Sequence, residues 1–383
     1  MSRIVIIAGE PRSLPNFRGH LLETMKGAGH EVHTVGPPAS AATLAWLAER
    51  AIPYHEAPVG RTGISPLADL ATFWSLWRIL RRVRPDTVLT YTIKPNVYGI
   101  PAAALAGVRR RCAMITGLGY AFIRRDGSTR WRLVHALARL LYWLGLRLAT
   151  CVIFQNRDDL AAFRQMGLLG RHKAAGVVAG SGVDIHRFAV RPLPDRPVFL
   201  MVARLLRDKG IGEYIAAAGI VRASHPEAEF HLVGPSDPGP AAFPLAEVEA
   251  AARAGTVIYH GATEDVRTFI AAARIYVLPS YREGTPRSAL EAMAMGRPVI
   301  TTDVPGCRAA VENGRNGILV PHAAAGPLAK AMIRLIGNPA EAARMGAEGR
   351  AIAEKTYDVR KVTAEIMRLC GYAAPPRQPG QTW

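Results

Sequence analysis

The sequence predicts an α/β protein made of doubly wound units, and three observations lead to that class. The chain opens with a mainly apolar strand at residues 3–8, followed by a loop, a helical stretch and a second strand, HEVHTV, at residues 30–35. This order of strand, helix and strand is typical of a doubly wound sheet. The chain has 383 residues, which is too long for one ordinary core, so two domains are expected. A further strand, helix and strand are predicted at residues 274–300.

The segment at residues 274–300 reads RIYVLPSYREGTPRSALEAMAMGRPVI and organises the second half of the chain. Its first apolar residues predict a strand buried on both faces, which Pro279 ends because proline cannot donate to a sheet. Thr285 is then expected as the N-cap of a helix and Pro286 as its first residue. Gly296 is expected just beyond the last residue of that helix.

Two glutamates bring chemistry to this segment. Glu283 follows the predicted strand, and Glu291 lies about two turns inside the helix among apolar neighbours. The N-terminus of a helix carries roughly half a positive charge and N–H groups that suit a phosphate. Ligands of open parallel sheets bind at the carboxyl ends of strands, where Glu283 falls. Two ordinary solvated glutamates are the alternative, but the glycine and the cap beside them favour a ligand site.

This pair of glutamates resembles a known motif. Glu283 and Glu291, within EGTPRSALEA, resemble the E-x7-E motif of the family 4 retaining glycosyltransferases. The resemblance covers about residues 1–370 and implies the GT-B fold, an α/β architecture in which two Rossmann-like domains face each other across a cleft. It also implies that Glu283 contacts the hydroxyls of the transferred sugar and that Glu291 holds the nucleotide ribose.

The same resemblance implies the remaining residues of the donor side. Arg204 and Lys209, within ARLLRDKG, resemble the pair that binds the donor diphosphate, and we expect both to act in catalysis with Glu283. Cations are needed there because transfer releases a nucleoside diphosphate, whose developing charge they stabilise. Exposed surface cations are the alternative. The residues expected to bind the donor, besides Glu291, are Gly284, Thr285, Pro286, Gly261 and Gly234.

The first half of the chain carries the expected acceptor side. Residues 15–19 (PNFRG) resemble the acceptor-side loop of the family, and residues 92–99 (TIKPNVYG) and 116–122 (TGLGYAF) resemble bacterial members that extend polyprenyl-diphosphate-linked sugars. Arg18 is interpreted either as a contact to an acceptor phosphate or as a solvated residue at the start of a helix. The residues expected at the acceptor side of the cleft are Asn16, Arg18, Lys94, Asn96, Gly117 and Gly119.

Charge is concentrated in one part of the chain. The net charge is +18, and residues 61–150 alone carry 15 basic and 3 acidic side chains. Such a one-sided charge indicates an anionic partner, which could be lipid headgroups, diphosphates or nucleic acid. The predicted helices at residues 66–83 and 130–148 combine leucines and tryptophans with arginines, a pattern typical of helices that lie in a membrane surface. Burial in the core of the first domain is the alternative.

Composition limits the other functions. The four cysteines lie far apart, show no metal-ligand spacing and fit a reduced cytoplasm. No D-x-D sequence stands at a donor-type position, so the enzyme is expected to need neither a metal nor a cofactor. The first residues lack the features of a signal peptide and read as a strand.

The domain boundaries are expected as follows. Residues 1–190 form an acceptor-binding Rossmann-like domain, and residues 191–355 form a nucleotide-sugar-binding one. Residues 356–373 form a helix that packs back on the first domain, and residues 374–383 are disordered.

These features together predict a retaining glycosyltransferase at the cytoplasmic, inner face of a bacterial plasma membrane. By resemblance, the donor is a UDP-sugar of the galactose, N-acetylgalactosamine or N-acetylglucosamine type. The acceptor is a polyprenyl-diphosphate-linked saccharide in surface polysaccharide or glycoprotein glycan synthesis. In this class the leaving diphosphate helps to deprotonate the acceptor, so no side-chain nucleophile is expected. Two rival hypotheses are a nucleotide-sugar epimerase of the same fold and a basic nucleic-acid-binding protein, the latter without a supporting motif.

Overall fold

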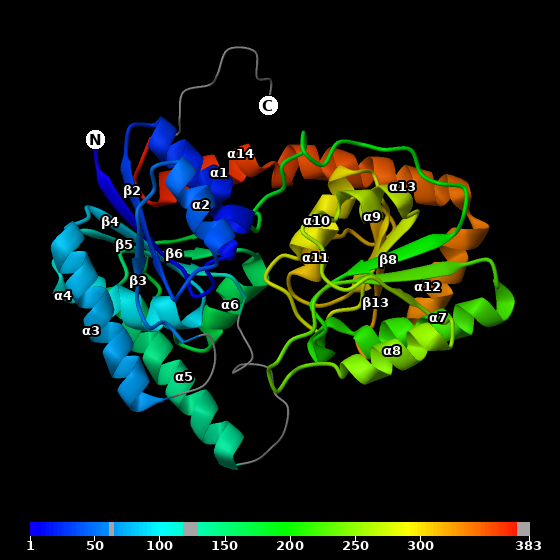
Figure 1. Ribbon diagram of the computed structural model, residues 1–383, viewed down its shortest axis with the longest axis horizontal. Helices are drawn as coiled ribbons and strands as arrows, with labels where there is room; N and C mark the ends of the chain where they lie inside the picture. Colours follow the sequence, from blue (N-terminus) through cyan, green and yellow to red (C-terminus); the bar gives the residue numbers. More distant parts are fainter. Residues whose placement is uncertain (61–64, 118–128, 374–383) are drawn as a thin grey trace. The chain divides into compact units, whose positions relative to one another are not determined.

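The computed structural model describes residues 1–60, 65–117 and 129–373, and it divides into two compact units (Figure 1). Unit 1 comprises Met1–Ser181 and the end of the chain from Arg360, and unit 2 comprises Gly182–Val359. The divisions after Ser181 and Val359 replace those that we placed after residues 190 and 355. The expected disorder of residues 374–383 falls outside the described residues.

Unit 1 is built on a sheet of seven parallel strands in the order β3-β2-β1-β4-β5-β6-β7. Short apolar runs form these strands because both faces of the sheet are covered. Residue 4 of β1 pairs with residue 87 of β4, which places the two strands side by side in the centre. The strands are β1 (Arg3–Ile7), β2 (Glu31–Gly36), β3 (Tyr54–Glu56), β4 (Thr87–Tyr91), β5 (Arg110–Ile115), β6 (Cys151–Phe154) and β7 (Ala175–Val177).

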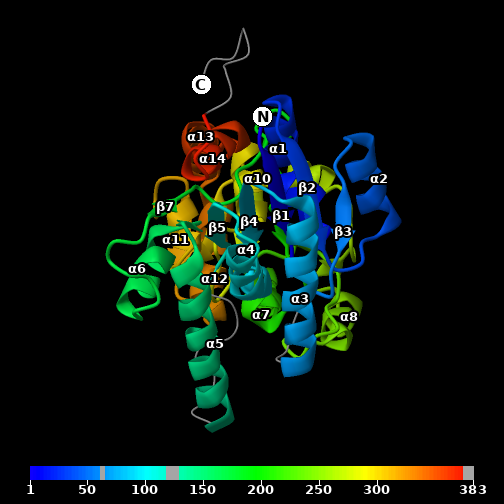
Figure 2. The ribbon, with the colours of Figure 1, turned by 90° about the vertical axis from the view of Figure 1, so that its left-hand side faces the viewer.

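Helices cover both faces of this sheet, as Figure 2 shows from one side. Ile4 and Ile6 face a core cluster that α1, α2 and α14 complete, whereas Val5 and Ile7 face the side of α3 and α4. The last helix of the chain therefore belongs to the core of the first unit. The helices are α1 (Ser13–Gly27), α2 (Ala41–Glu49), α3 (Pro66–Val83), the π-helix η1 (Pro95–Gly99), α4 (Ile100–Leu105), α5 (Thr129–Leu148), α6 (Arg157–Gln165) and α14 (Val359–Leu369).

Unit 2 is built on six parallel strands in the order β10-β9-β8-β11-β12-β13. They are β8 (Val198–Val202), β9 (Glu229–Val233), β10 (Ile258–Tyr259), β11 (Ile275–Leu278), β12 (Val299–Thr302) and β13 (Gly317–Val320). Around them lie η3 (Arg207–Lys209), α7 (Ile211–Ser224), α8 (Leu245–Arg253), α9 (Arg267–Ala272), α10 (Arg287–Ala294), α11 (Cys307–Ala310), α12 (Ala325–Gly337), α13 (Pro339–Ile352) and η4 (Ala353–Tyr357). The predicted doubly wound class is confirmed in both units.

Two predicted helix starts are wrong. Helix α1 begins at Ser13, so Asn16 and Arg18 lie on a helix and not in or just after a loop. Pro15 is tolerated there because the first turn of a helix needs no N–H donor at that position. Helix α10 begins at Arg287, and the residue before it, Pro286, is its N-cap and not its first residue.

The predicted cap of α10 is also wrong, but its predicted end is confirmed. The N-cap residue is Pro286, and the hydroxyl of Thr285, one residue earlier, donates to the carbonyl of Gly284 at 2.9 Å. Helix α10 ends at Ala294, and Gly296 follows with a φ of +81° and donates to the carbonyl of Met293 at 3.0 Å. A left-handed glycine at this position satisfies carbonyls that the helix leaves over.

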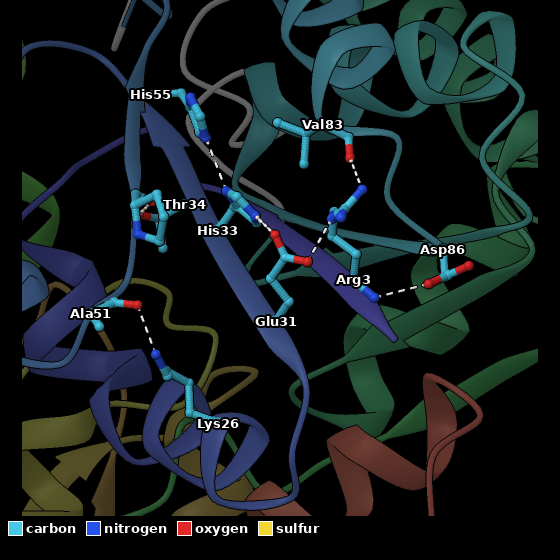
Figure 3. Close-up of polar contacts among 10 residues, drawn as sticks. Arg3, Lys26, Glu31, His33, Thr34, Ala51, His55, Val83 and Asp86 are labelled. Carbon is cyan, nitrogen blue, oxygen red and sulfur yellow. Dashed lines mark hydrogen bonds and ion pairs between the residues drawn. The ribbon is translucent and has the colours of Figure 1, made fainter. Parts of the chain in front are cut away.

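A chain of polar side chains crosses the first three strands of unit 1 (Figure 3). Arg3 Nε donates to Glu31 Oε2 at 2.8 Å, and Glu31 Oε1 lies 2.8 Å from His33 Nε2. His33 Nδ1 in turn lies 3.1 Å from His55 Nε2, with the two rings stacked at 5.3 Å. We call these residues the histidine chain of unit 1.

Unit 2 contains a matching histidine chain. Glu229 Oε2 lies 3.2 Å from His231 Nε2, and His231 Nδ1 lies 2.9 Å from His260 Nε2, with the rings stacked at 5.1 Å. The sequence repeats as well, with EVHTVGP at residues 31–37 and EFHLVGP at residues 229–235. In both units a Tyr-His pair on or next to the third strand completes the pattern, at residues 54–55 and 259–260. Our reading of the sequence missed this internal repeat.

Candidate functional site

The predicted catalytic pair of unit 2 is in contact at the carboxyl ends of two neighbouring strands. Lys209 follows β8 and Glu283 follows β11, and Lys209 Nζ lies 2.5 Å from Glu283 Oε1. The hydroxyl of Ser280 donates to the same oxygen at 2.8 Å. The side chains of Lys209 and Glu283 are 21% and 13% exposed, so the pair is partly desolvated but still accessible to a ligand.

Glycines let the backbone close up around this pair. Gly210 has a φ of +76°, and a Cβ there would lie 2.2 Å from the carbonyl oxygen of Pro279. Gly306 has a φ of +84°, and a Cβ there would lie 2.3 Å from the carbonyl oxygen of Glu283. Both positions therefore require glycine, because a side chain would collide with backbone atoms. The loops after β8, β11 and β12 are thereby fixed against one another, which holds the carboxylate of Glu283 in place.

Arg204 lies in the loop after β8 and pairs with Asp237, in the loop after β9. Its NH1 atom is 2.7 Å from Asp237 Oδ2, and its side chain is 46% exposed. Gly234 has a φ of +150°, and a Cβ there would lie 1.9 Å from the carbonyl oxygen of Ala203. Gly234 also donates to the carbonyl of Gly261 at 2.7 Å. The loops that follow β8, β9 and β10 are thus joined through backbone contacts, and Arg204 lies in the first of them.

Glu291 is the second carboxylate of the motif and is 8% exposed. Arg287 Nε donates to its Oε1 at 2.9 Å from one turn earlier on α10. Burial raises the pKa of the Glu291 carboxyl, and the ion pair with Arg287 opposes that rise. The hydrogen bond from Arg287 on the same helix therefore fixes the orientation of the Glu291 carboxylate.

The N-terminus of α10 lies beside these carboxylates. Gly284, Thr285 and Pro286 connect Glu283 to the helix, and Pro286 offers no side-chain cap to it. The helix N-terminus attracts an anion. Lys209 and the end of α10 thus supply positive charge near Glu283.

The predicted acceptor-side residues of unit 1 behave differently. Lys94 Nζ lies 2.8 Å from Asp69 Oδ1, and the two side chains are 12% and 7% exposed. Asn96 is 1% exposed, and its amide group accepts from Thr90 Oγ1 at 2.6 Å and donates to the carbonyl of Met114 at 2.9 Å. Asn96 therefore ties η1 to β4 and β5, and it does not present its side chain to solvent.

Arg18 is buried, so its interpretation as a solvated residue is wrong. It is 2% exposed, and its guanidinium lies over the ring of Tyr91 at 5.0 Å. Its NH1 atom lies 3.3 Å from the hydroxyl of Ser181. Asn16, two residues earlier on α1, is exposed. Gly117 follows β5 with a φ of +130°, and Gly119 lies outside the described residues.

Four residues of these arrangements were missed by our reading of the sequence. Arg287 could have been found, because a basic residue four positions before Glu291 on a helix faces it. Asp237 lies in a segment rich in proline and glycine that carries no periodic signal. Ser280 and Asp69 could not be recognised as partners without the fold. Within the described part of the chain, no group of three or more His, Cys, Asp or Glu residues is arranged to hold a metal ion.

Two sequence profiles match the chain, one in each unit. The profile described as "Glycosyl transferase 4-like domain" matches residues 16–179, and the one described as "Glycosyl transferases group 1" matches residues 196–338. Together they cover most of the chain. The protein is a glycosyltransferase, and it belongs to the group 1, family 4-like glycosyltransferases.

Characterised relatives are distant but span most of the chain. The N,N'-diacetylbacillosaminyl-diphospho-undecaprenol alpha-1,3-N-acetylgalactosaminyltransferase of Campylobacter jejuni is 28% identical over 331 residues, which cover 82% of this chain and 84% of that protein. The UDP-Gal:alpha-D-GlcNAc-diphosphoundecaprenol alpha-1,3-galactosyltransferase of Escherichia coli is 27% identical over 276 residues, covering 67% of this chain and 68% of that protein.

Solved structures establish the fold as GT-B. Sucrose-phosphate synthase from Thermosynechococcus elongatus matches with a TM-score of 0.78 at 21% identity, over 96% of this chain and 98% of that one. HepE from Anabaena in complex with UDP-glucose matches with a TM-score of 0.74 at 21% identity, over 97% of this chain and all of that one. The predicted pair of Rossmann-like domains is therefore correct.

Proposed function

We propose that the protein is a retaining glycosyltransferase that moves a sugar of the galactose, N-acetylgalactosamine or N-acetylglucosamine type from a UDP-sugar to a polyprenyl-diphosphate-linked saccharide. The product serves surface polysaccharide or glycoprotein glycan synthesis. The observation that carries the proposal is the contact of Lys209 with Glu283 beside the N-terminus of α10. A carboxylate suited to sugar hydroxyls lies there next to a cation suited to a diphosphate.

The donor diphosphate lies at Lys209 and Arg204 in this proposal. Each of these cations has a carboxylate partner in the ligand-free chain, Glu283 for Lys209 and Asp237 for Arg204. Charge grows on the leaving diphosphate as the bond to the sugar breaks, and fixed cations lower the energy of that state. Glu283 accepts hydrogen bonds from the sugar, and the backbone of residues 284–286 contributes the N–H groups of the helix start. Gly234 and Gly261 border the nucleotide.

The ribose lies at Glu291. A carboxylate that accepts hydrogen bonds from two ribose hydroxyl groups recognises the ribose strongly, because hydrogen bonds to a charged acceptor are stronger than those between neutral groups. Burial raises the pKa of the Glu291 carboxyl, and the ion pair with Arg287 opposes that rise and so favours the charged form. Support for UDP as the nucleotide comes from relatives: the structure of HepE holds UDP-glucose, and the Escherichia coli relative is named for UDP-Gal.

The acceptor carries a polyprenyl diphosphate. Both relatives named above act on sugars linked to undecaprenol through a diphosphate, according to their names. Lys94 follows β4, and ligands of parallel sheets collect at that end of a strand. Lys94, Asn16, Arg18 and Gly117 are proposed to line the acceptor side. The leaving diphosphate takes the proton of the acceptor hydroxyl, so Glu283 positions the sugar and does not attack it.

The membrane surface that presents such an acceptor is proposed to bind α3 and α5, on the cytoplasmic side of a bacterial plasma membrane. Leu67 and Trp74 on α3 are 83% and 43% exposed, and Leu133 and Trp143 on α5 are 70% and 38% exposed. The other face of α3 is buried through Leu76, Leu80 and Val83, so burial and exposure divide the helix. In the described part of the chain, no helix is apolar over enough of its length to cross a bilayer.

A panel of nucleotides tests the donor proposal. Thermal unfolding of the purified protein is measured with UDP, GDP and a set of UDP-sugars, and then transfer of the stabilising sugar to a polyprenyl-diphosphate-linked acetamido sugar is assayed. We expect UDP and one class of UDP-sugar to raise the melting temperature. A response to GDP-sugars alone overturns the donor, and turnover of the donor without an acceptor, yielding an epimer, favours the epimerase.

A charge reversal tests the membrane proposal. Changing Arg78, Arg81 and Arg82 to glutamate is expected to release the protein from anionic liposomes, because each cation near such a surface contributes about 1 kcal/mol. The matched control changes three exposed arginines of unit 2, Arg308, Arg315 and Arg344, to glutamate. If both triple variants are released from the liposomes equally, the effect comes from net charge alone, and α3 is not the membrane contact.

A further inference from the structure

An apolar groove lies in unit 1 between α3 and α5. Figure 2 shows that these two helices extend beyond the sheet in the same direction. Leu70 and Phe73 of α3 line one side of the groove, Leu137 and Leu141 of α5 line the other, and Tyr98 of η1 lies between them. Its volume is about 320 Å³. Leu70 is 54% exposed, so the apolar wall is open to the outside and is not part of a closed core.

The groove has one polar end. Asp69 lines it, and Asp69 is paired with Lys94 at 2.8 Å and hydrogen-bonded to Tyr98. Lys94 follows β4 by three residues, at the end of the sheet where ligands of parallel sheets collect. Lys94 does not itself line the groove, and its side chain is 12% exposed. A molecule with an anionic head and a hydrocarbon chain matches this arrangement if its head replaces Asp69 as the partner of Lys94.

Other exposed apolar side chains lie on the same two helices. Leu67 on α3, at 83% exposure, and Leu133 and Leu140 on α5, at 70% and 52%, remain uncovered. A water-exposed group of large apolar side chains on two neighbouring helices marks a binding surface for an apolar partner. The groove and these exposed side chains therefore belong to the same two helices, which are the helices proposed to meet the membrane.

The charge of this region argues against a second copy of the chain as the occupant. Residues 61–150, the segment that includes both helices, carry 15 basic and 3 acidic side chains, so two copies that meet through this segment repel each other. A flat bilayer surface would cover the exposed leucines but would not account for a channel with an ion pair at its end. A single flexible hydrocarbon chain with an anionic head fits both the channel and the charge.

We propose that the groove between α3 and α5 binds a segment of the isoprenoid chain of the acceptor lipid, with the diphosphate end of that lipid toward Lys94. The inference rests on the proposed function, since it concerns the acceptor of that reaction. The enzyme then recognises the lipid as well as the saccharide, and a soluble acceptor with a short isoprenoid chain is a better substrate than the same saccharide diphosphate with a methyl group.

Kinetics with matched acceptors test this inference in the absence of any bilayer. The ratio of kcat/KM for the short-isoprenoid acceptor to kcat/KM for the methyl acceptor is measured for the parent, Leu70→Ser and Leu105→Ser. Leu70 and Leu105 are 54% and 56% exposed, and Leu105 lies on α4 outside the groove. We expect the ratio to fall about tenfold in Leu70→Ser, because apolar contact area is lost, and to stay unchanged in Leu105→Ser.

The outcomes separate this inference from the proposed function. A ratio near one for the parent, with both acceptors used, overturns the groove and leaves the transferase intact. A fall that is equal in both serine variants also overturns it. Failure of transfer to any acceptor overturns the proposed function, and the groove is then judged by binding alone.

That binding is measured with a photo-crosslinking amino acid at position 137 and a radiolabelled polyprenyl diphosphate. Labelled protein that is protected by excess unlabelled polyprenyl diphosphate, but not by phospholipid vesicles, supports the groove. Protection by vesicles to the same degree assigns the groove to the bilayer, and a crosslink to a second copy or to the chain's own residues assigns it to protein. Either result overturns the isoprenoid site.

Discussion

The two units share a framework at the edge of their sheets but differ in what they build on it. In unit 1, Glu31, His33 and His55 link the second and third strands, and in unit 2, Glu229, His231 and His260 do the same. The loop after the first strand is also anchored alike, since residue 8 donates to residue 35 at 2.8 Å and residue 203 donates to residue 233 at 3.0 Å.

The difference begins one residue later. Unit 2 continues with Arg204 and then Lys209, which contacts Glu283, whereas unit 1 continues with Gly9 and Glu10 and enters α1. A feature common to both units cannot be what makes one of them a donor site. The comparison therefore favours a structural role for the histidine chains, and it is consistent with the catalytic role that we propose for the charged residues after β8 and β11.

The largest effect is expected where only unit 2 has a residue. Glu283→Ala should reduce turnover on the order of a thousandfold, because a group that contacts the sugar in the transition state is lost. The matched control is Glu341→Ala, which removes a carboxylate of the same unit that pairs with Arg334 at 2.6 Å. Steady-state kinetics with melting temperatures measure both. Equal losses of turnover in the two variants would show that a broken ion pair, and not the site, is responsible.

The next effect sharpens the comparison at an equivalent glycine in each unit. Gly234→Ala should destabilise the protein by about 3 kcal/mol, because its Cβ would lie 1.9 Å from the carbonyl oxygen of Ala203 at a φ of +150°. Gly36→Ala should cost less, about 1 kcal/mol, because its φ is not positive and the nearest backbone atom to its Cβ, the carbonyl oxygen of Ala8, would lie 3.0 Å away. The hydroxyl end of Tyr54, at 2.7 Å, would have to shift. Denaturant unfolding measures the free energy of unfolding of both variants. A larger loss of stability at Gly36 than at Gly234 would contradict the predicted difference between the two units.

Glu291→Gln should move affinity and stability in opposite directions. UDP binding is expected to weaken by roughly 2 kcal/mol, because a charged acceptor becomes neutral. Burial raises the pKa of Glu291 above its ordinary value of 4.5, so the folded protein loses stability as the pH rises through that raised value. The variant escapes this loss.

Calorimetry and thermal unfolding follow the two quantities. The melting temperature of Glu291→Gln should exceed that of the parent at neutral pH, and the difference should vanish below the ordinary pKa of a glutamate. A variant that is less stable than the parent at neutral pH, with unchanged affinity for UDP, would make Glu291 a structural ion-pair partner of Arg287.

The smallest effect concerns the framework that both units share. Partial burial lowers the pKa of His55 and of His260, with a further contribution from the histidine that each one faces. The unfolded chain then takes up protons first as the pH falls below about 6.5, so the stability present above that pH is lost in mild acid. In His55→Gln, the drop in melting temperature on acidification should be smaller than in the parent by about 2 °C. In His260→Gln the difference should be smaller still, because His260 is more exposed. Steeper acid loss in either variant would reject the assignment.

Periodic segments were predicted well, and irregular ones were not. Helix α3 has the predicted bounds, Pro66–Val83, because proline begins it and the apolar residues recur at helical spacing. The short helices α8 and α9, the edge strand β7 and the π-helix η1 carry no comparable signal and were missed. Helix α1 starts earlier than predicted because proline within its first turn was read as part of a loop.

The segments expected at the donor side carry a clearer sequence signal than those expected at the acceptor side, for a physical reason. Positions such as Gly234, Gly210 and Gly306 admit only glycine, so the motif around Glu283 is visible in the letters of the sequence. Among the residues expected at the acceptor side, the sequence does not reveal that the Asn96 side chain points into the unit, where it ties η1 to β4 and β5. Which way a polar side chain points depends on register and packing, which one sequence does not specify.

The place of α14 in the chain sets the order in which the protein can be completed during synthesis. Val362, Ile366 and Met367, near the end of the chain, share a core cluster with Ile4 and Ile6 at its beginning. The residues of unit 2 are contiguous and emerge from the ribosome before α14 does. The domain that begins the chain therefore keeps an open apolar face until α14 has been synthesised, while the one encoded after it can already fold. A nascent chain that stops short of α14 leaves that face exposed to chaperones and proteases.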